Sequence, residues 1–307
     1  MTSQDLPLLG RAAIVTGVSR RRGIGFGIAH RLAELGADLF VHHFAPHDSA
    51  LPWGGDDLDA VFAELRAAQP SGARFGELSA DLADAESAPT VITAATEAVG
   101  TPRILVCNHA RSGGDGSIFD MTAERLDGHW SVNTRATLLL TRYFAEAFSG
   151  SSRAAGATEP GATEADGTGA DATAPGVRQP TTGPFDEHQT GRVFWMTSGQ
   201  QNGPMPGEVA YAASKAALAG LTPTVASELL TRGILLNTIN PGPVNTGYLD
   251  EETTDRPLEA IQERMRRLPL GRFGLPDDPA RLIGWLATDE GRWVVGEVIT
   301  SDGGFRL

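Results

Sequence analysis

Short runs of apolar and β-branched residues alternate along this chain with stretches of helical periodicity. The runs that predict strands are AAIVT (12–16), DLFVHHF (38–44), RFGELSA (74–80), RILVCN (103–108), RVFWMT (192–197), ILLNTIN (234–240) and EVITSD (297–302). The helical patterns lie near 24–36, 56–68, 84–99, 122–148, 208–231 and 277–288. Strand and helix alternating in this way predict an α/β fold, a doubly wound, seven-stranded parallel sheet with helices on both faces. Ligands of such a sheet bind at the carboxyl ends of its strands.

One segment interrupts the alternation. Residues 149–190 consist mainly of Ala, Gly, Thr, Pro and acidic residues, with Val177 and Phe185 as the large apolar side chains. Such a composition cannot offset the entropy lost on ordering, so we expect a flexible insertion within one domain that spans 1–307. Because it joins a helix to a strand, it should emerge at the edge opposite the carboxyl ends. A solvated spacer is favoured over a partner-binding tail, and deletion of 152–188 should leave turnover intact.

The composition restricts the partners. The formal charge of −13 and the pI near 4.9 disfavour nucleic acid and anionic membranes, so a small molecule is the favoured partner. The single cysteine, Cys107, rules out an intrachain disulfide and indicates a reducing compartment. The sequence shows no secretory leader and no apolar run of about 18 residues. We therefore expect a cytoplasmic protein with no membrane partner.

The stretch IVTGVSRRRGIGFGIAHRLAELGADLFVHHF (14–44) reads as a buried strand, a glycine turn, an amphipathic helix and a second strand. Gly17, Gly23, Gly25 and Gly27 would permit a tight turn, the approach of a phosphate to the backbone, and close packing of the helix on the sheet. This order is typical of a Rossmann-type dinucleotide-binding unit. Alone it is a weak signal, because glycine turns often serve packing.

A second signal is YAASKAAL at 211–218. Tyr211 and Lys215 are four residues apart on a predicted helix, so their side chains share a face. An ammonium beside a phenol favours the phenolate and lowers a pKa that is ordinarily about 10. Such a tyrosine can exchange a proton with a carbonyl or alcohol oxygen near neutral pH. The same spacing also occurs on solvent-exposed helix faces.

In combination these motifs resemble the short-chain dehydrogenase/reductase family, and among its members the 3-oxoacyl-carrier-protein reductases with a Tyr-x-x-x-Lys pair. The resemblance runs from Arg11 to Phe305 and rests on TGVSRRRGIG (16–25), ADL (80–82), CNHA (107–110), SVNTRAT (131–137), TSGQQ (197–201), YAASK (211–215), NPGPVNT (240–246), GRFGLPDDPA (271–280) and GEVITSDGGF (296–305). It implies an enzyme that transfers a hydride between a nicotinamide cofactor and a carbonyl or secondary alcohol.

The resemblance also implies a catalytic tetrad. Tyr211 would be the acid in reduction and the base in oxidation, and Lys215 would hold the nicotinamide ribose and lower the pKa of Tyr211. Ser198 would hydrogen-bond the substrate oxygen. Asn133 would support a water that relays protons to Lys215.

Cofactor contacts follow from the same resemblance. Asp81 would bind the adenine, Asn108 would sit above the cofactor, and Thr246 would hold the nicotinamide carboxamide. Besides Tyr211 and Lys215, the contacts implied for the cofactor are Gly17, Ser19, Arg20, Arg21, Gly23, Ile24, Gly25, Asp81, Leu82, Asn108, Pro241, Gly242, Val244 and Thr246.

The glycine turn departs from the family pattern, because five residues separate Gly17 from Gly23 where the family usually has three. Longer turns occur in its enoyl-reductase branch, which spaces its Tyr and Lys differently. Three of the five residues are arginines, and no acid follows the second strand before Asp48. We therefore favour NADP over NAD, which stays possible, with Arg20 and then Arg21 at the 2′-phosphate. Arg22 is expected to point into water.

The histidines carry weaker expectations. His109 stands where the family usually has Ala, and a structural histidine is favoured over a contact with cofactor or substrate. The HHFAPHD cluster (42–48) does not predict a metal, because His42 and His43 alternate faces on a strand.

The substrate is the weakest part of the prediction. The segment 247–270 stands where the family has its variable substrate loop, and further guesses for the pocket are Gln200, Gln201, Met205 and Glu208. Family members form dimers and tetramers through the helices corresponding to 122–148 and 208–231. The favoured function is an NADPH-dependent ketone reductase of the 3-oxoacyl type. The alternatives are an alcohol dehydrogenase working oxidatively and a non-catalytic nucleotide-binding interaction protein, against which the intact tetrad argues.

Overall fold

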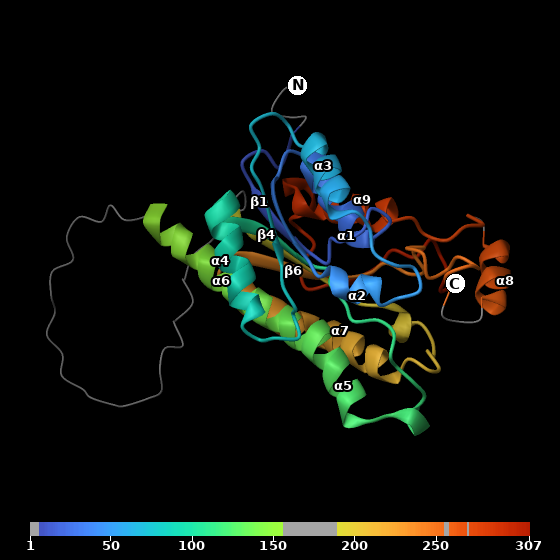
Figure 1. Cartoon of the computed structure of the whole chain (residues 1–307). Helices are drawn as coiled ribbons and strands as arrows, with labels where there is room; N and C mark the ends of the chain where they lie inside the picture. The colour runs from blue at the N-terminus through green and yellow to red at the C-terminus, as the bar shows by residue number, and fades with distance from the viewer. Residues whose placement is uncertain (1–5, 156–188, 255–257, 269) are drawn as a thin grey trace, which may run out of the picture.

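A computed structural model describes residues 6–155, 189–254, 258–268 and 270–307 (Figure 1). Seven parallel strands form one sheet in the order β3-β2-β1-β4-β5-β6-β7. The order reverses between β1 and β4, and in such sheets the crevice for ligands lies at that point. The strands are β1 (Ala12–Thr16), β2 (Asp38–His43), β3 (Phe75–Ser79), β4 (Pro102–Cys107), β5 (Gly191–Met196), β6 (Ile234–Asn240) and β7 (Val298–Thr300). Each coincides with a predicted strand, so the predicted fold is confirmed.

Two layers of helices cover the sheet on opposite faces (Figure 1). One layer contains α1 (Ile24–Glu34), α3 (Leu58–Ala68) and α9 (Asp277–Ala287); the other contains α4 (Ser87–Val99), α6 (Ala136–Ala155) and α7 (Val209–Leu230). Strand β1 serves both cores, because Ala13 and Val15 face the first layer whereas Ala12 and Ile14 face the second. Burial on both faces explains why the central strands β1, β4, β5 and β6 read as nearly continuous apolar runs, whereas the edge strands β3 and β7 are only partly buried.

The helix predicted for 122–148 is divided. It consists of α5 (Ala123–His129), a π-helical turn η2 (Trp130–Arg135) and α6. Helix α6 continues to Ala155, so the first seven residues of the segment expected to be flexible are helical. The rest of that segment, up to 188, lies outside the described residues. Two further helices were not predicted individually, α2 (Ala45–Ser49) and α8 (Glu259–Arg267).

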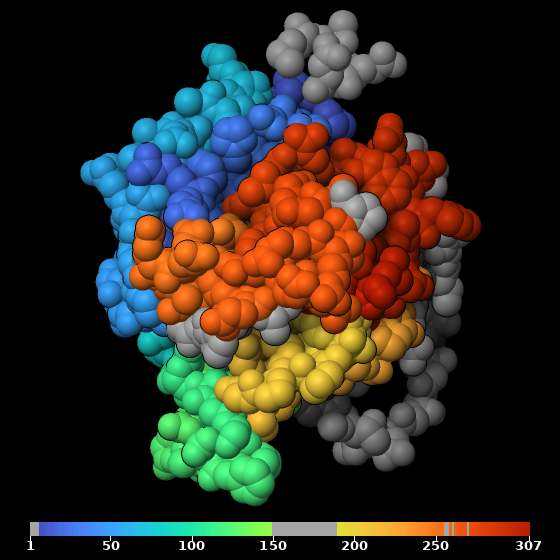
Figure 2. All heavy atoms as spheres, turned by 90° about the vertical axis from the view of Figure 1, so that its right-hand side faces the viewer, coloured from blue at the N-terminus to red at the C-terminus, as the bar shows by residue number. Residues whose placement is uncertain are grey.

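The carboxyl ends of the strands open toward the side where α2 and α8 lie (Figure 1). Figure 2 shows this side: the segments that follow β6, in orange, cross its centre between the N-terminal segments in blue and the residues after β5 in yellow. The segments that meet at this edge are therefore far apart in the sequence, and we refer to the edge, where ligands of such sheets bind, as the cleft. In the described part of the chain, every helix is too short or too polar to span a bilayer.

Candidate active site

The turn between β1 and α1 needs its glycines for steric reasons. Gly17 has a positive φ of 74°, and a Cβ there would lie 2.8 Å from the Cα of His109. A Cβ on Gly25 would lie 2.3 Å from the carbonyl oxygen of Gly17, and one on Gly27 would lie 2.8 Å from that of Pro276. Helix α1 begins directly after Gly23, which has no side chain to cap it, so its first amides can serve a phosphate. This turn fits the pyrophosphate of a dinucleotide.

Asn108, at the end of β4, lies against this turn. Its side-chain amide donates to the carbonyl oxygens of Thr16 and Gly17, both at 3.1 Å. The bonds fix the turn relative to β4 and leave Asn108 half-buried at the cleft. Asp81, by contrast, is exposed after β3, where its carboxylate accepts from the amide of Ala83 at 2.8 Å.

Asn133 lies in the π-helical turn and is fully buried. Its side-chain oxygen accepts from the amide of Arg111 at 2.6 Å. Its side-chain nitrogen donates to the hydroxyl of Ser214 at 2.9 Å and to the carbonyl of Arg111 at 3.3 Å. Asn133 thereby connects the loop after β4 with α7, and its expected relay of protons through a water stays a prediction.

Tyr211 and Lys215 lie in the first two turns of α7. The ammonium of Lys215 is 5.8 Å from the centre of the Tyr211 ring and donates to the carbonyl of Met196 at 2.8 Å. Lys215 is 2% exposed, and this burial lowers its pKa to about 8. Tyr211 is half-buried. The pair is therefore not a solvated one, which was the alternative that its spacing left open.

Ser198 follows β5 at the same edge of the sheet and is half-buried. Its hydroxyl makes no capping bond to the short helix η4 (Gly199–Gln201) that follows it. The preceding residue, Thr197, donates to the carbonyl of Lys215 at 2.9 Å and so ties the end of β5 to α7. Gln200, a guess for the pocket lining, donates to the hydroxyl of Thr197 at 2.9 Å.

Asp115 was missed by the sequence analysis. Its carboxylate accepts from the amides of Ala210 and Tyr211 at 3.0 and 2.7 Å, so it caps α7 from a loop 96 residues before the tyrosine. Glu208, the residue directly before α7, makes no such bond with its side chain. His129 of α5 meets the Tyr211 ring edge-on, with the ring centres 6.5 Å apart. The available signal was an acid in the glycine-rich loop GGDG (113–116).

The segment after β6 approaches the glycine turn. Gly242 has a φ of 67°, and a Cβ there would lie 2.4 Å from the Cβ of Asp302. Val244 is buried and forms a bridge with Gly274. The carbonyl oxygen of Thr246 accepts a hydrogen bond from the glycine turn, as described next.

Arg20, the first choice for the 2′-phosphate, is already engaged. Its Nε donates to Asp48 at 3.0 Å, and its Nη1 donates to the carbonyl of Thr246 at 2.8 Å. The hydroxyl of Ser19 also donates to Asp48. The negative charge of Asp48, the first acid after β2, is thus balanced by Arg20 of the glycine turn.

The next two arginines are engaged as well. Arg21 binds both oxygens of Asp56, at 3.0 and 2.7 Å, and also Glu64 at 3.1 Å. Arg22 was expected to point into water, but it donates to Asp250 at 2.7 Å, although its side chain is 64% exposed. Two of the arginines therefore hold the segment after β6 against the glycine turn.

The histidines have structural partners. His109 is buried between the hydroxyl of Thr16, 2.7 Å from Nδ1, and the carbonyl of Val132, 3.0 Å from Nε2. Burial places the pKa of His109 well below its ordinary value, and the structural role favoured from the sequence accounts for these contacts. His42 bonds the carbonyl of Ala80 at 2.8 Å, and burial lowers its pKa to about 4. Within the described ranges, no group of three or more His, Cys, Asp or Glu side chains could hold a metal.

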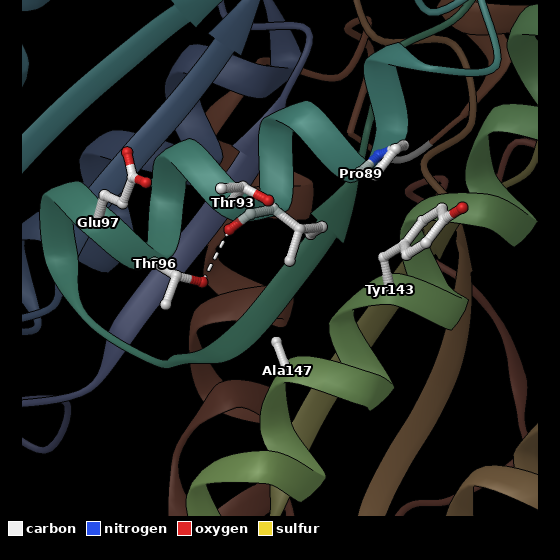
Figure 3. A pocket seen from close by; sticks show the side chains of 7 residues that line it. Pro89, Thr93, Thr96, Glu97, Tyr143 and Ala147 are labelled. Atoms are coloured by element: carbon white, nitrogen blue, oxygen red, sulfur yellow. Dashed lines mark hydrogen bonds between the residues drawn. The ribbon is translucent and has the colours of Figure 1, made fainter.

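A surface pocket lies elsewhere, between α4 and α6 (Figure 3). Thr93, Thr96 and Glu97 reach it from α4, and Tyr143 and Ala147 from α6. The hydroxyl of Thr96 is bonded to the carbonyl of Ile92 at 2.8 Å within α4. None of the tetrad residues lines this pocket, so the candidate active site is the carboxyl edge of the sheet and not this pocket.

Comparison with known proteins gives the family. A family model described as "Enoyl-(Acyl carrier protein) reductase" matches residues 17–165 and 181–306. The unmatched stretch, 166–180, falls inside the low-complexity segment. The chain belongs to the short-chain dehydrogenase/reductase family. It is therefore an NAD(P)-dependent oxidoreductase that acts on carbonyl or alcohol groups.

Relatives in this family match almost the whole chain. "Uncharacterized oxidoreductase YjdA" of Bacillus subtilis (strain 168) is 32% identical over 296 residues, 96% of each chain. "NADPH-dependent aldehyde reductase-like protein, chloroplastic" of Arabidopsis thaliana is 31% identical over 307 residues, 99% of this chain and 97% of the relative. Among solved structures, a short chain dehydrogenase from Burkholderia cenocepacia J2315 in complex with NADP has a TM-score of 0.71 at 28% identity, covering 98% of this chain and 100% of the other.

Proposed function

We propose that this protein is an NADP(H)-dependent ketone reductase, with a 3-oxoacyl compound as the favoured type of substrate. The observation that carries the proposal is the buried Lys215, whose ammonium lies 5.8 Å from the centre of the Tyr211 ring at the mouth of the cleft. With a pKa of about 8, Lys215 is largely cationic at neutral pH. The pair thus combines a proton donor with a nearby positive charge.

The residues of the chain supply the proton chemistry. When bound, NADPH supplies a hydride to the carbonyl carbon. The hydroxyl of Tyr211 donates its proton to the substrate oxygen, and the charge of Lys215 stabilises the phenolate that remains. The hydroxyl of Ser198, which caps nothing in η4, donates a hydrogen bond to the same oxygen. Asn133 holds the loop after β4 against α7 and keeps Tyr211 in place.

Two observations support NADP as the cofactor. The carboxylate of Asp48, which could otherwise repel a 2′-phosphate, forms an ion pair with Arg20 and accepts a hydrogen bond from the hydroxyl of Ser19. The Arabidopsis relative is named as NADPH-dependent, and the Burkholderia structure contains NADP. The glycine turn, with Gly25 packed against Gly17, would hold the pyrophosphate.

The same residues can work in reverse, so alcohol oxidation is the second candidate activity. A non-catalytic nucleotide-binding protein is less well supported. A binding protein could use Lys215 to hold the nicotinamide ribose, but it has no use for the phenol of Tyr211 beside that cation.

The proposal also covers the oligomeric state of the protein. We propose one catalytic domain that forms a homodimer or homotetramer through α6 and α7, as the family resemblance implies. The outer face of α7 supports this, because Ala213, Ala216 and Gly220 are exposed on it and would allow close approach of a second helix. The buried Cys107 is in keeping with a reducing compartment such as the cytoplasm.

The test is Tyr211→Phe, assayed with a panel of ketones and alcohols by NADPH and NADH absorbance. We expect turnover to fall by about 100- to 10,000-fold while NADPH binding, measured by calorimetry, is unchanged. Tyr143→Phe, a half-buried tyrosine of α6 in the pocket beside α4 and outside the tetrad, is the matched control and should keep full activity. Undiminished turnover in Tyr211→Phe would refute the mechanism. A wild type that turns over no ketone or alcohol would favour the binding protein.

A further inference from the structure

One arginine at the cleft differs from its neighbours. Arg20, Arg21 and Arg22 each hold an acid of the same chain. The guanidinium of Arg111 is half-buried and has neither an ion pair nor a hydrogen bond within residues 6–155, 189–254, 258–268 and 270–307. A half-buried cation without a partner loses part of its hydration for no compensating bond. Such a group is a candidate for binding a ligand.

The position of Arg111 is fixed by the active site itself. It follows β4 in a loop whose two ends are anchored: Asn108 bonds the glycine turn, and Asp115 bonds the amide of Tyr211. Arg111 lies between them in sequence, and both its amide and its carbonyl are held by the side chain of Asn133. The root of the side chain is therefore placed between the cofactor turn and the catalytic tyrosine.

The guanidinium of Arg111 lies next to two glycines, Gly128 and Gly114. A Cβ on Gly128 of α5 would lie 2.8 Å from Nη1 of Arg111, and one on Gly114 would lie 3.7 Å from Nη2. Any larger residue at 128 would displace the guanidinium. The charge also reaches His47 of α2: burial is the main cause of the lowered pKa of that histidine, and the charges of Arg111 and Arg20 lower it further, opposed by Asp48 and Asp81. The positive charge of Arg111 therefore acts on the segment after β2, where His47 lies.

We infer that Arg111 binds an anionic oxygen group, a phosphate or a carboxylate, of the ligand in the cleft. The planar guanidinium can donate two parallel hydrogen bonds to either group. The group could come from the cofactor or from an oxo-acid substrate, and both sources share this chemistry. The inference deepens the proposed function by adding a residue that selects charged ligands. Only the measurements with substrates rest on the proposed function; those with the cofactors do not.

The test compares Arg111→Met and Arg111→Lys with the wild type. Calorimetry gives the dissociation constants of NADPH and NADH and, with NADP⁺ present so that no hydride can be transferred, those of acetoacetate and methyl acetoacetate. Arg281→Met, an exposed arginine of α9 paired with Asp277, is the matched control. We expect Arg111→Met to weaken the anionic ligand by about 10- to 100-fold, and Arg111→Lys to recover part of the loss because it keeps the charge.

Each outcome has one reading. If Arg111→Met weakens the binding of NADPH and not of NADH, Arg111 binds the 2′-phosphate. If it weakens both cofactors equally and Arg111→Lys recovers part of the affinity, Arg111 binds the pyrophosphate. If Arg111→Met weakens the binding of acetoacetate and not of its methyl ester, Arg111 binds a carboxylate of the substrate. If all four dissociation constants stay within twofold of the wild type, or if lysine recovers nothing, the inference is overturned. A wild type that turns over no carbonyl compound would refute the proposed function, yet the cofactor measurements would still decide the role of Arg111.

Discussion

The bond between Asp115 and the start of α7 makes the sharpest prediction about how the catalytic tyrosine is held. The Asp115 side chain is 7% exposed, and its carboxylate accepts from the amides of Gly116, Ala210 and Tyr211 at 2.8, 3.0 and 2.7 Å. The substitution Asp115→Ala leaves these three amides without their acceptor. It also removes a negative charge from the N-terminus of a 22-residue helix.

The cost follows from these contacts. Losing a side-chain cap destabilises a protein by about 1 to 2 kcal/mol, and the charge at the helix terminus adds up to about 1 kcal/mol. Because Glu208 makes no capping bond with its side chain, nothing replaces the lost acceptor. We expect Asp115→Ala to lower the free energy of unfolding by about 2 to 3 kcal/mol. Asp115→Asn keeps one acceptor oxygen and should lower it by about 1 kcal/mol.

Catalysis should suffer beyond stability. Tyr211 is the third residue of α7, so fraying of the first turn displaces its hydroxyl from the substrate oxygen. We expect kcat to fall by about 10- to 100-fold in Asp115→Ala, with a much smaller change in the KM for NADPH, since the glycine turn is untouched.

Urea unfolding followed by circular dichroism gives the stability, and NADPH absorbance gives kcat and KM. Asp120→Ala, an exposed acid of the same connection bonded to Ser117, serves as the control and should change kcat little. If Asp115→Ala unfolds at the urea concentration of the wild type and keeps its kcat, the carboxylate does not hold the tyrosine and the reasoning is wrong.

Three other predictions test separate parts of the cleft. Gly25→Ala puts a Cβ 2.3 Å from a backbone oxygen, so NADPH binding should be lost and stability should fall by about 1 to 3 kcal/mol, whereas Gly203→Ala, with open space around it, should be neutral in the same calorimetric and urea assays. The pKa of Lys215 is about 8 in the folded protein and 10.5 ordinarily, so the unfolded chain binds more protons between these values. The free energy of unfolding should therefore rise by about 3 kcal/mol as the pH increases from 8 to 10.5, and Lys215→Met should lack this rise. Finally, Arg22→Gln frees the segment after β6, so chymotrypsin should cleave after Tyr248 faster than in the wild type, and an unchanged rate by mass spectrometry would show that the ion pair does not hold that segment.

Much of the fold is readable from local pattern. A strand buried on both faces must be largely apolar at successive positions, so β1, β4, β5 and β6 stand out as short runs, whereas the edge strands β3 and β7 are only partly buried. The glycines of the turn are also readable, because close contacts such as that between Gly25 and Gly17 exclude every side chain. The division of the helix at 122–148 was not readable, because the apolar period continues through it. There the bonds of His109 and Asn133 to residues of other elements accompany the π-helical turn.

By itself, the sequence determined the parallel sheet, the carboxyl edge at which its ligands are expected, and the elements that carry Ser198, Tyr211 and Lys215. These follow from periodicity and spacing, which act over a few residues. Only the tertiary structure decided which charges are paired. The acid partners of the arginines at 20–22 lie 28 to 228 residues away, and the partner of Tyr211's amide lies 96 residues away. Charge pairing depends on distances in space, and the chain order does not contain them.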